Sequence, residues 1–172
     1  MTRTFVLIVA TAAVLATGPE LQACGDKSLS AGGIRMQRAL AARYPASVLA
    51  YMPSGSPAAA ATRKLKLPET LRFFGHRFHE VASVAELRTS IETGKYNLVL
   101  ADLADVAALE RDLGPSSTRV VFVPIAYQLT KEAAREAARQ RRFLITAPSM
   151  AATYLTTIAE AVAFASAGSR KG

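Results

Sequence analysis

Four polar residues that could bind a ligand or attack one stand directly after short apolar runs of the sequence: Ser54, Asp102, Asp105 and Ser149. The carboxylate pair could hold a cation or a basic ligand. A serine could act as a nucleophile if a general base lay within hydrogen-bond reach. The alternative is that these residues close turns and cap helices, as Asp and Ser often do. We favour this alternative for the pair, with Asp102 closing a strand and Asp105 capping the next helix.

The two histidines of the chain, His76 and His79, do not complete such a site. Residues three apart in a strand point to opposite faces, which argues against a shared metal ion. We expect both side chains to lie on the surface. The sequence contains no Gly-x-Ser-x-Gly elbow, no Gly-x-Gly-x-x-Gly turn and no Walker loop. We therefore expect no metal, no cofactor and no catalytic residue.

The stretch Tyr96–Asp102 must position the central carboxylate. Its leucines and valine run without a polar alternation, which indicates a strand buried on both faces, as in a parallel sheet. Ligands of such sheets usually bind at the carboxyl ends of the strands. We expect Asp102 to lie at that edge, near Ser54 and Ser149.

From Pro45 onward, short apolar runs alternate with helix-like segments. This alternation predicts an α/β fold with a five-stranded, doubly wound parallel sheet and right-handed crossovers. The flavodoxin-like strand order 2-1-3-4-5 is the simplest candidate. The expected strands are 47–52, 77–81, 96–101, 119–123 and 143–146. The expected helices are 34–44, 58–74 with an interruption at Pro68, one capped by Ser83 and Glu86, 106–113, 130–140 and 150–165.

The segments Gly75–Arg77, Val81–Leu87 and Gly94–Asp102 resemble the corresponding parts of a bacterial response-regulator receiver domain. The resemblance spans about residues 47–164 and implies the same fold. It places Asp102 where a receiver carries its phosphorylated aspartate, and Pro148 where a proline follows the fifth strand.

Three other parts of receiver chemistry are replaced in this chain. The resemblance implies an acidic pair after the first strand for magnesium, a serine or threonine after the fourth strand, and a lysine after the fifth. Here these places hold Met52–Ser54, Pro124–Ala126 and Ala147. Phosphoryl transfer depends on positioning and charge neutralisation. Because Asp102 alone supplies neither, we expect no phosphorylation.

The N-terminal segment has the layout of a secretory signal peptide: a positive start, the apolar run Phe5–Ala16, and a small residue at a cleavage point. This run is shorter than the ~20 residues that span a bilayer as a helix. The following Leu21-Gln22-Ala23-Cys24 resembles the lipobox of bacterial lipoproteins, although Glu20 and Gln22 depart from the usual small or apolar residues. We expect lipidation at Cys24. The alternatives are cleavage near Ala23 by the general signal peptidase, or no cleavage.

The chain of 172 residues has a formal net charge of +8. Its basic residues are scattered and no aromatic residues interleave with them, so we expect no nucleic-acid binding. Two helices carry local clusters. The 34–44 helix has arginines off an apolar face of Met36, Leu40, Ala41 and Tyr44, and the 130–140 helix repeats Lys131, Arg135 and Arg139 every four residues. We favour ordinary solvated surfaces. The sharper hypothesis for the first cluster is that it binds anionic lipid. For the second cluster, it is that the helix binds anionic lipid, cell-wall polymer or an acidic partner.

The sequence thus predicts a signal peptide over 1–23, a tether with a short amphipathic helix over 24–45, a receiver-like α/β domain over 46–167 and a tail over 168–172. The leading expectation is an exported, lipid-anchored binding or interaction module that is not an enzyme. Its partners would be the membrane and an envelope protein. A periplasmic small-ligand-binding protein using Ser54, Asp102 and Ser149 is the second hypothesis, and a hydrolase-type enzyme at the same edge is the third.

Overall fold

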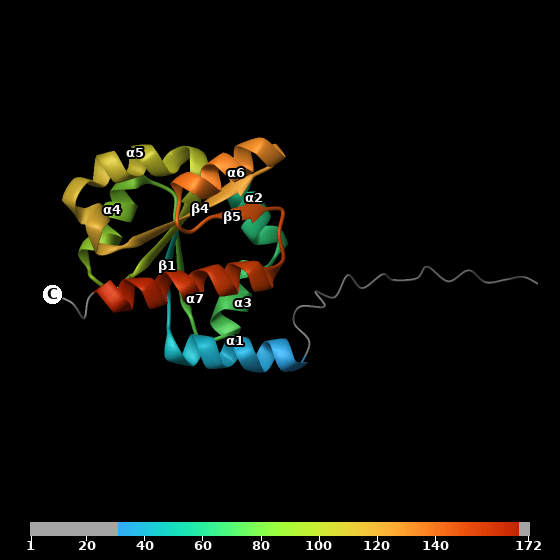
Figure 1. The fold of residues 1–172 in the computed structure, drawn as a ribbon. Coiled ribbons are helices and arrows are strands. Elements are labelled where there is room, and N and C mark those ends of the chain that lie inside the picture. The colour runs from blue at the N-terminus through green and yellow to red at the C-terminus, as the bar shows by residue number, and fades with distance from the viewer. Residues whose placement is uncertain (1–30, 169–172) are drawn as a thin grey trace, which may run out of the picture.

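The computed structural model describes residues 31–168, so the predicted signal segment and Cys24 lie outside the described residues. The chain folds into an all-parallel five-stranded sheet in the order β2-β1-β3-β4-β5, which confirms the predicted flavodoxin-like order (Figure 1). The strands are β1 (Ser47–Tyr51), β2 (Arg77–Val81), β3 (Leu98–Asp102), β4 (Val121–Tyr127) and β5 (Ile145–Ala147). The helices are α1 (Ala31–Arg43), α2 (Pro57–Lys64), α3 (Leu67–Phe73), α4 (Val84–Glu92), α5 (Leu103–Leu113), α6 (Lys131–Gln140) and α7 (Ala151–Gly168), with a 3-10 helix η2 (Gly114–Arg119).

Helices cover both faces of the sheet, as a doubly wound fold requires. Figure 1 shows α3 and α7 on one side of the sheet and α4 and α5 on the other. Alternate residues of β3 divide between the two cores, because successive side chains of a strand point to opposite faces. Leu98 and Leu100 lie in the core below α2, α3 and α7, whereas Val99 and Ala101 lie in the core below α4 and α5. All four residues are fully buried.

The predicted interruption of the 58–74 helix is confirmed, because this segment forms two helices and Lys66, two residues before Pro68, adopts a left-handed conformation with φ 49°. The bounds of the fourth strand differ from the prediction. Strand β4 continues past Pro124, where we expected it to have ended. Proline has no N–H to donate to a neighbouring strand. The three-residue strand β5 pairs only with Ile125–Tyr127, so no bond is lost at Pro124 on that side.

Helix α1 packs on α7, and Gln37 donates a side-chain hydrogen bond of 3.1 Å to Thr156. The side of α1 that faces the domain carries Ile34, Ala41 and Tyr44. Met36, which we expected on this apolar side, is 65% exposed. The helix is rotated relative to the predicted face because its contact with α7 runs through Gln37.

Two side chains hold the start of β1. The backbone N–H of Ala46 donates to His76 Nδ1 at 3.0 Å, and that of Ser47 donates to Asn97 Oδ1 at 3.0 Å. His76 is therefore a buried hydrogen-bond acceptor, and the prediction that it lies on the surface is wrong. His79 is exposed, as expected.

We expect the stability of the domain to fall as the pH drops below about 6.5, the pKa of an unperturbed histidine. Burial lowers the pKa of His76 below that value. At pH values between the lowered pKa of His76 in the folded chain and its ordinary pKa in the unfolded chain, His76 is protonated in the unfolded chain only. The free energy of unfolding therefore decreases with falling pH, by up to about 1.4 kcal/mol per pH unit for one group. Urea unfolding at a series of pH values measures this slope.

The matched controls are the two histidines themselves. His76→Gln should remove most of the slope between pH values of about 7 and 5, while His79→Gln should leave it unchanged. An unchanged slope in His76→Gln would show that other groups cause the acid sensitivity.

Candidate functional site

The carboxyl-terminal edge of the sheet brings together some of the predicted site residues. Ser54 lies in the turn after β1, and Asp102 is the last residue of the adjacent strand β3. Ser149 follows β5, which is separated from β3 by β4. Two strand spacings amount to about 10 Å. Ser54 and Asp102 therefore follow adjacent strands, whereas Ser149 belongs to the other end of the edge.

Asp102 acts as the N-cap of α5, where its Oδ1 accepts a hydrogen bond of 3.1 Å from the backbone N–H of Ala104. Asp105 lies in the first turn of that helix. We expected Asp105 to be the cap, and this assignment is wrong because α5 begins three residues earlier than predicted. A carboxylate at either position stabilises a helix N-terminus. Both aspartates thus have a structural role at this edge.

The two carboxylates also affect each other and a neighbouring tyrosine. Burial raises the pKa of Asp105, and the negative charge of Asp102 raises it further. Burial raises the pKa of Tyr51, as do the charges of Asp105 and Asp112. Tyr51 ends β1 and packs against the core below α4 and α5. One local pattern indicates this position: Tyr51 is two residues after Leu49 in the strand, so the two side chains share a face.

Apolar residues occupy the other strand ends around Asp102. Met52 is 3% exposed after β1, and Ile125 lies opposite Asp102 in β4. Ala147 ends β5 and precedes Pro148 through a cis peptide bond. Within residues 31–168 there is no group of three or more His, Cys, Asp or Glu side chains that could hold a metal ion. Met52, Ile125 and Ala147 carry no charge, so these strand ends offer Asp102 and Asp105 no cationic side chain.

Neither histidine lies at this edge. His76 contacts Ala46 at the opposite, amino-terminal edge of the sheet. His79 is in the middle of β2, paired with Leu49, and its ring stacks on Tyr96 at 6.0 Å. No serine or aspartate of the carboxyl-terminal edge can therefore use a histidine as a general base, which removes the arrangement that the hydrolase hypothesis needs.

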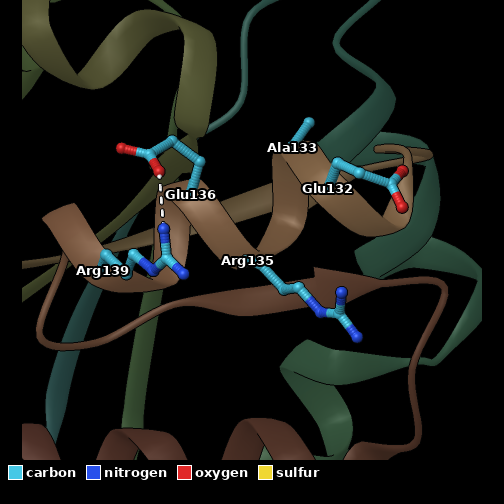
Figure 2. Close-up of a pocket in the computed structure, with 5 residues that line it drawn as sticks. All are labelled: Glu132, Ala133, Arg135, Glu136 and Arg139. Carbon is cyan, nitrogen blue, oxygen red and sulfur yellow. Dashed lines mark ion pairs between the residues drawn. The ribbon is translucent and has the colours of Figure 1, made fainter.

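Helix α6 is unusual in having no buried residue along its whole described length. Thr130 caps it by accepting a hydrogen bond of 3.2 Å from Ala133 N–H. A shallow hollow of about 470 Å³ lies along the helix (Figure 2). Figure 2 shows Arg135 and Glu136 pointing to different sides of α6, with Glu136 paired to Arg139 at 3.5 Å. Exposed ion pairs of this kind contribute little to stability.

A partly buried ion pair fixes the end of α6 to the rest of the domain. Arg141, the residue after the helix, donates two hydrogen bonds of 2.7 and 3.2 Å to the carboxylate of Glu110 on α5. Bidentate pairs of this geometry are stronger and more directional than single contacts. The alanine-rich surface of α6 is thereby held in place and left open to solvent.

None of the helices between residues 31 and 168 has the length and apolarity needed to cross a bilayer. No known protein family matches this chain, and no curated protein is detectably similar to it in sequence.

Proposed function

We propose that the protein is an exported, lipid-anchored interaction module whose receiver-like domain carries no phosphoacceptor chemistry. The observation that supports this most directly is the surroundings of Asp102. Its carboxylate caps α5, the neighbouring strand ends hold the apolar residues Met52 and Ile125, and the more distant end of β5 holds Ala147. An aspartyl phosphate carries about two negative charges, which need a metal or a cationic side chain close by.

The export and the anchor are proposed from the sequence. The charged start, the apolar run and the lipobox-like Leu21–Cys24 together fit a bacterial lipoprotein signal. A cysteine that carries more than one acyl chain holds a protein stably on a membrane. This location also separates the domain from cytoplasmic kinases.

The interaction role is proposed from α6. A surface helix of a domain normally buries an apolar stripe, and α6 buries none of its residues. Its exposed side presents alanines together with Lys131, Arg135 and Arg139, and Glu132 and Glu136 lie between these cations. An acidic protein partner in the envelope would cover both the alanines and the cations. A small-ligand-binding role at the edge near Ser54 and Asp102 is the alternative.

The intact mass of the protein recovered from its host's membrane fraction tests the anchor. We expect a chain that begins at Cys24 and carries acyl groups, and we expect the Cys24→Ala variant to lose them. A chain that begins after Ala23 without acyl groups would support a soluble exported protein. A full-length chain in the cytosol would contradict export.

Beryllium fluoride with magnesium tests the missing phosphoacceptor chemistry, because it mimics a phosphoryl group on an aspartate. We expect no saturable binding by calorimetry. Asp102→Asn is the matched variant, since asparagine also caps helices and should leave the fold intact. Saturable binding that disappears in Asp102→Asn would overturn this part of the proposal.

A further inference from the structure

The positive charge of the protein is concentrated on one side of the domain. Between Ala31 and Glu80 the sequence has eight lysines and arginines against two glutamates. Between Val81 and Met150 it has nine against eight acidic residues. The first stretch contains α1, α2 and α3, and the second contains α4, α5 and α6, which lie on the other side of the sheet (Figure 1). The domain therefore has a basic side and a nearly neutral side.

The basic side also presents apolar side chains. Met36 on α1 is 65% exposed and Phe73 on α3 is 60% exposed, the highest values for large apolar residues in the described part of the chain. The guanidinium of Arg38 lies 4.9 Å from the ring centroid of Phe73, so the two helices form one surface. We name this the α1/α3 surface. It consists of Arg35, Met36, Arg38, Arg43, Arg72 and Phe73.

These residues share the outward side of the domain. On α1, Ile34, Ala41 and Tyr44 face the core. At 100° per residue, Arg35, Met36 and Arg43 fall on the opposite side of the helix. Figure 1 shows α1 as the outermost element on this side of the sheet, beside α3 and α7. Met36 and Phe73 are left largely exposed to solvent in the described part of the chain.

Arginines around exposed methionine and phenylalanine match the chemistry of a membrane interface. Anionic headgroups attract the guanidinium groups, and the apolar side chains enter the boundary between headgroups and acyl chains. The place of this surface in the chain fits as well. Helix α1 opens the described region, and Cys24 precedes it by seven residues. Seven residues span at most about 25 Å. A lipidated Cys24 would hold α1 within that distance of the bilayer.

We propose that the α1/α3 surface docks on an anionic lipid bilayer, with Met36 and Phe73 inserted at the headgroup boundary and the four arginines on lipid phosphates. The cellular setting of this contact rests on the proposed anchor at Cys24. The contact itself is a property of the domain and fixes its orientation, with α4 and α5 pointing away from the membrane.

A site-specific fluorescent probe tests the orientation in the full chain. Cys24 is the only cysteine, so a Cys24→Ala background accepts a single new thiol. Met36→Cys and Phe73→Cys place an environment-sensitive fluorophore on the α1/α3 surface. Ala108→Cys, at an exposed position of α5, places it on the opposite side. With vesicles that contain phosphatidylglycerol, we expect a blue shift at positions 36 and 73 and none at 108. Phosphatidylcholine vesicles should give no shift.

Charge variants separate this surface from net charge alone. Arg35→Gln with Arg43→Gln should weaken the docked state roughly 25-fold, because each arginine at an anionic membrane contributes about fivefold. Arg135→Gln with Arg139→Gln removes the same charge from α6 and should leave the shift unchanged.

Several results would overturn the proposal. These are no shift at 36 and 73, no flotation of the labelled chain with anionic vesicles, an equal shift at 108, or an equal loss in the α6 variant. A shift that grows with protein concentration without vesicles would assign the surface to a second copy of the chain, and a shift caused by duplex DNA would assign it to nucleic acid. Because all variants lack Cys24, these outcomes are independent of whether the protein is lipidated.

Discussion

Replacing Leu98 by alanine should lower the free energy of unfolding by roughly 2–5 kcal/mol, the usual cost of a leucine-to-alanine change in a core. Leu98 is fully buried in β3 and lies opposite Val48 in β1 and Val121 in β4. The substitution removes apolar surface from the core and leaves a cavity that the central strands cannot close. Urea unfolding followed by circular dichroism measures the change.

Leu129→Ala is the matched control, because Leu129 is 36% exposed just before α6. Its cost should stay below about 1 kcal/mol. Similar losses for the two variants would show that Leu98 is not in the core and that β3 has another register.

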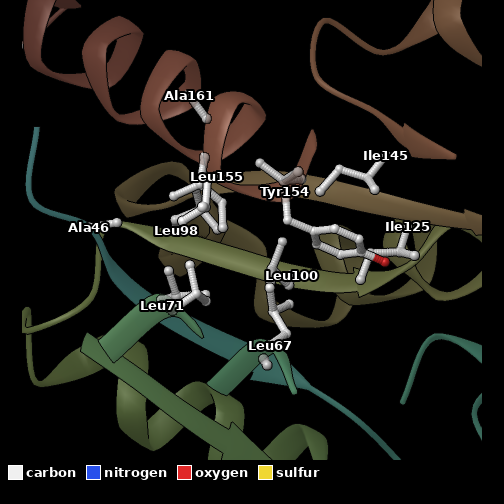
Figure 3. Close-up of a cluster of buried hydrophobic side chains, with 14 of the residues drawn as sticks. Ala46, Leu67, Leu71, Leu98, Leu100, Ile125, Ile145, Tyr154, Leu155 and Ala161 are labelled. Carbon is white, nitrogen blue, oxygen red and sulfur yellow. The ribbon is translucent and has the colours of Figure 1, made fainter. Parts of the chain in front are cut away.

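Replacing Tyr154 by phenylalanine should raise the free energy of unfolding by roughly 1–3 kcal/mol, which is the cost of a buried polar group without a partner. Tyr154 lies among Leu100, Ile125 and Ile145 (Figure 3). It is fully buried, and its hydroxyl has no hydrogen-bond partner among the described residues. Phenylalanine keeps the ring and its contacts while removing the unsatisfied hydroxyl.

The same substitution should have a larger effect in alkaline solution. Burial raises the pKa of Tyr154 from 10.0 to about 12. At pH values between 10.0 and about 12, Tyr154 loses its proton in the unfolded chain but keeps it in the folded chain. The free energy of unfolding of the wild type therefore falls as the pH rises through this interval. The gain of Tyr154→Phe should therefore be greater at a pH of about 11 than at about 7. A loss of stability at both values would indicate that the hydroxyl is hydrogen-bonded in solution.

The sheet could be predicted because its signals are local. The unbroken apolar run of β3 indicates a strand that is buried on both faces. The start of α4 is marked by Ser83 and Glu86, whose side chains accept hydrogen bonds from backbone N–H groups. Ser83 Oγ accepts from Glu86 N–H at 3.2 Å, and Glu86 accepts from Ala82 N–H at 3.0 Å. Each of these features depends on residues that are close in the sequence.

Features that depend on distant residues could not be predicted. The role of His76 is set by a backbone N–H thirty residues earlier, at Ala46. The rotation of α1, which exposes Met36, follows from its contact with α7. In the candidate site, strand order alone was enough to place Ser54 near Asp102. Asp102 and not Asp105 caps α5 because the helix begins at Leu103. The local sequence was compatible with a start at either Leu103 or Val106, so it could not identify the cap.

The lack of buried residues in α6 has a consequence for the dynamics of the domain. A segment that buries little apolar surface can open locally without unfolding the rest of the protein. The amide hydrogens of α6 should therefore exchange with solvent through local fluctuations, while those of β1 and β3 exchange only when the whole sheet opens. The pair between Arg141 and Glu110 should keep the end of α6 attached to α5 during these fluctuations.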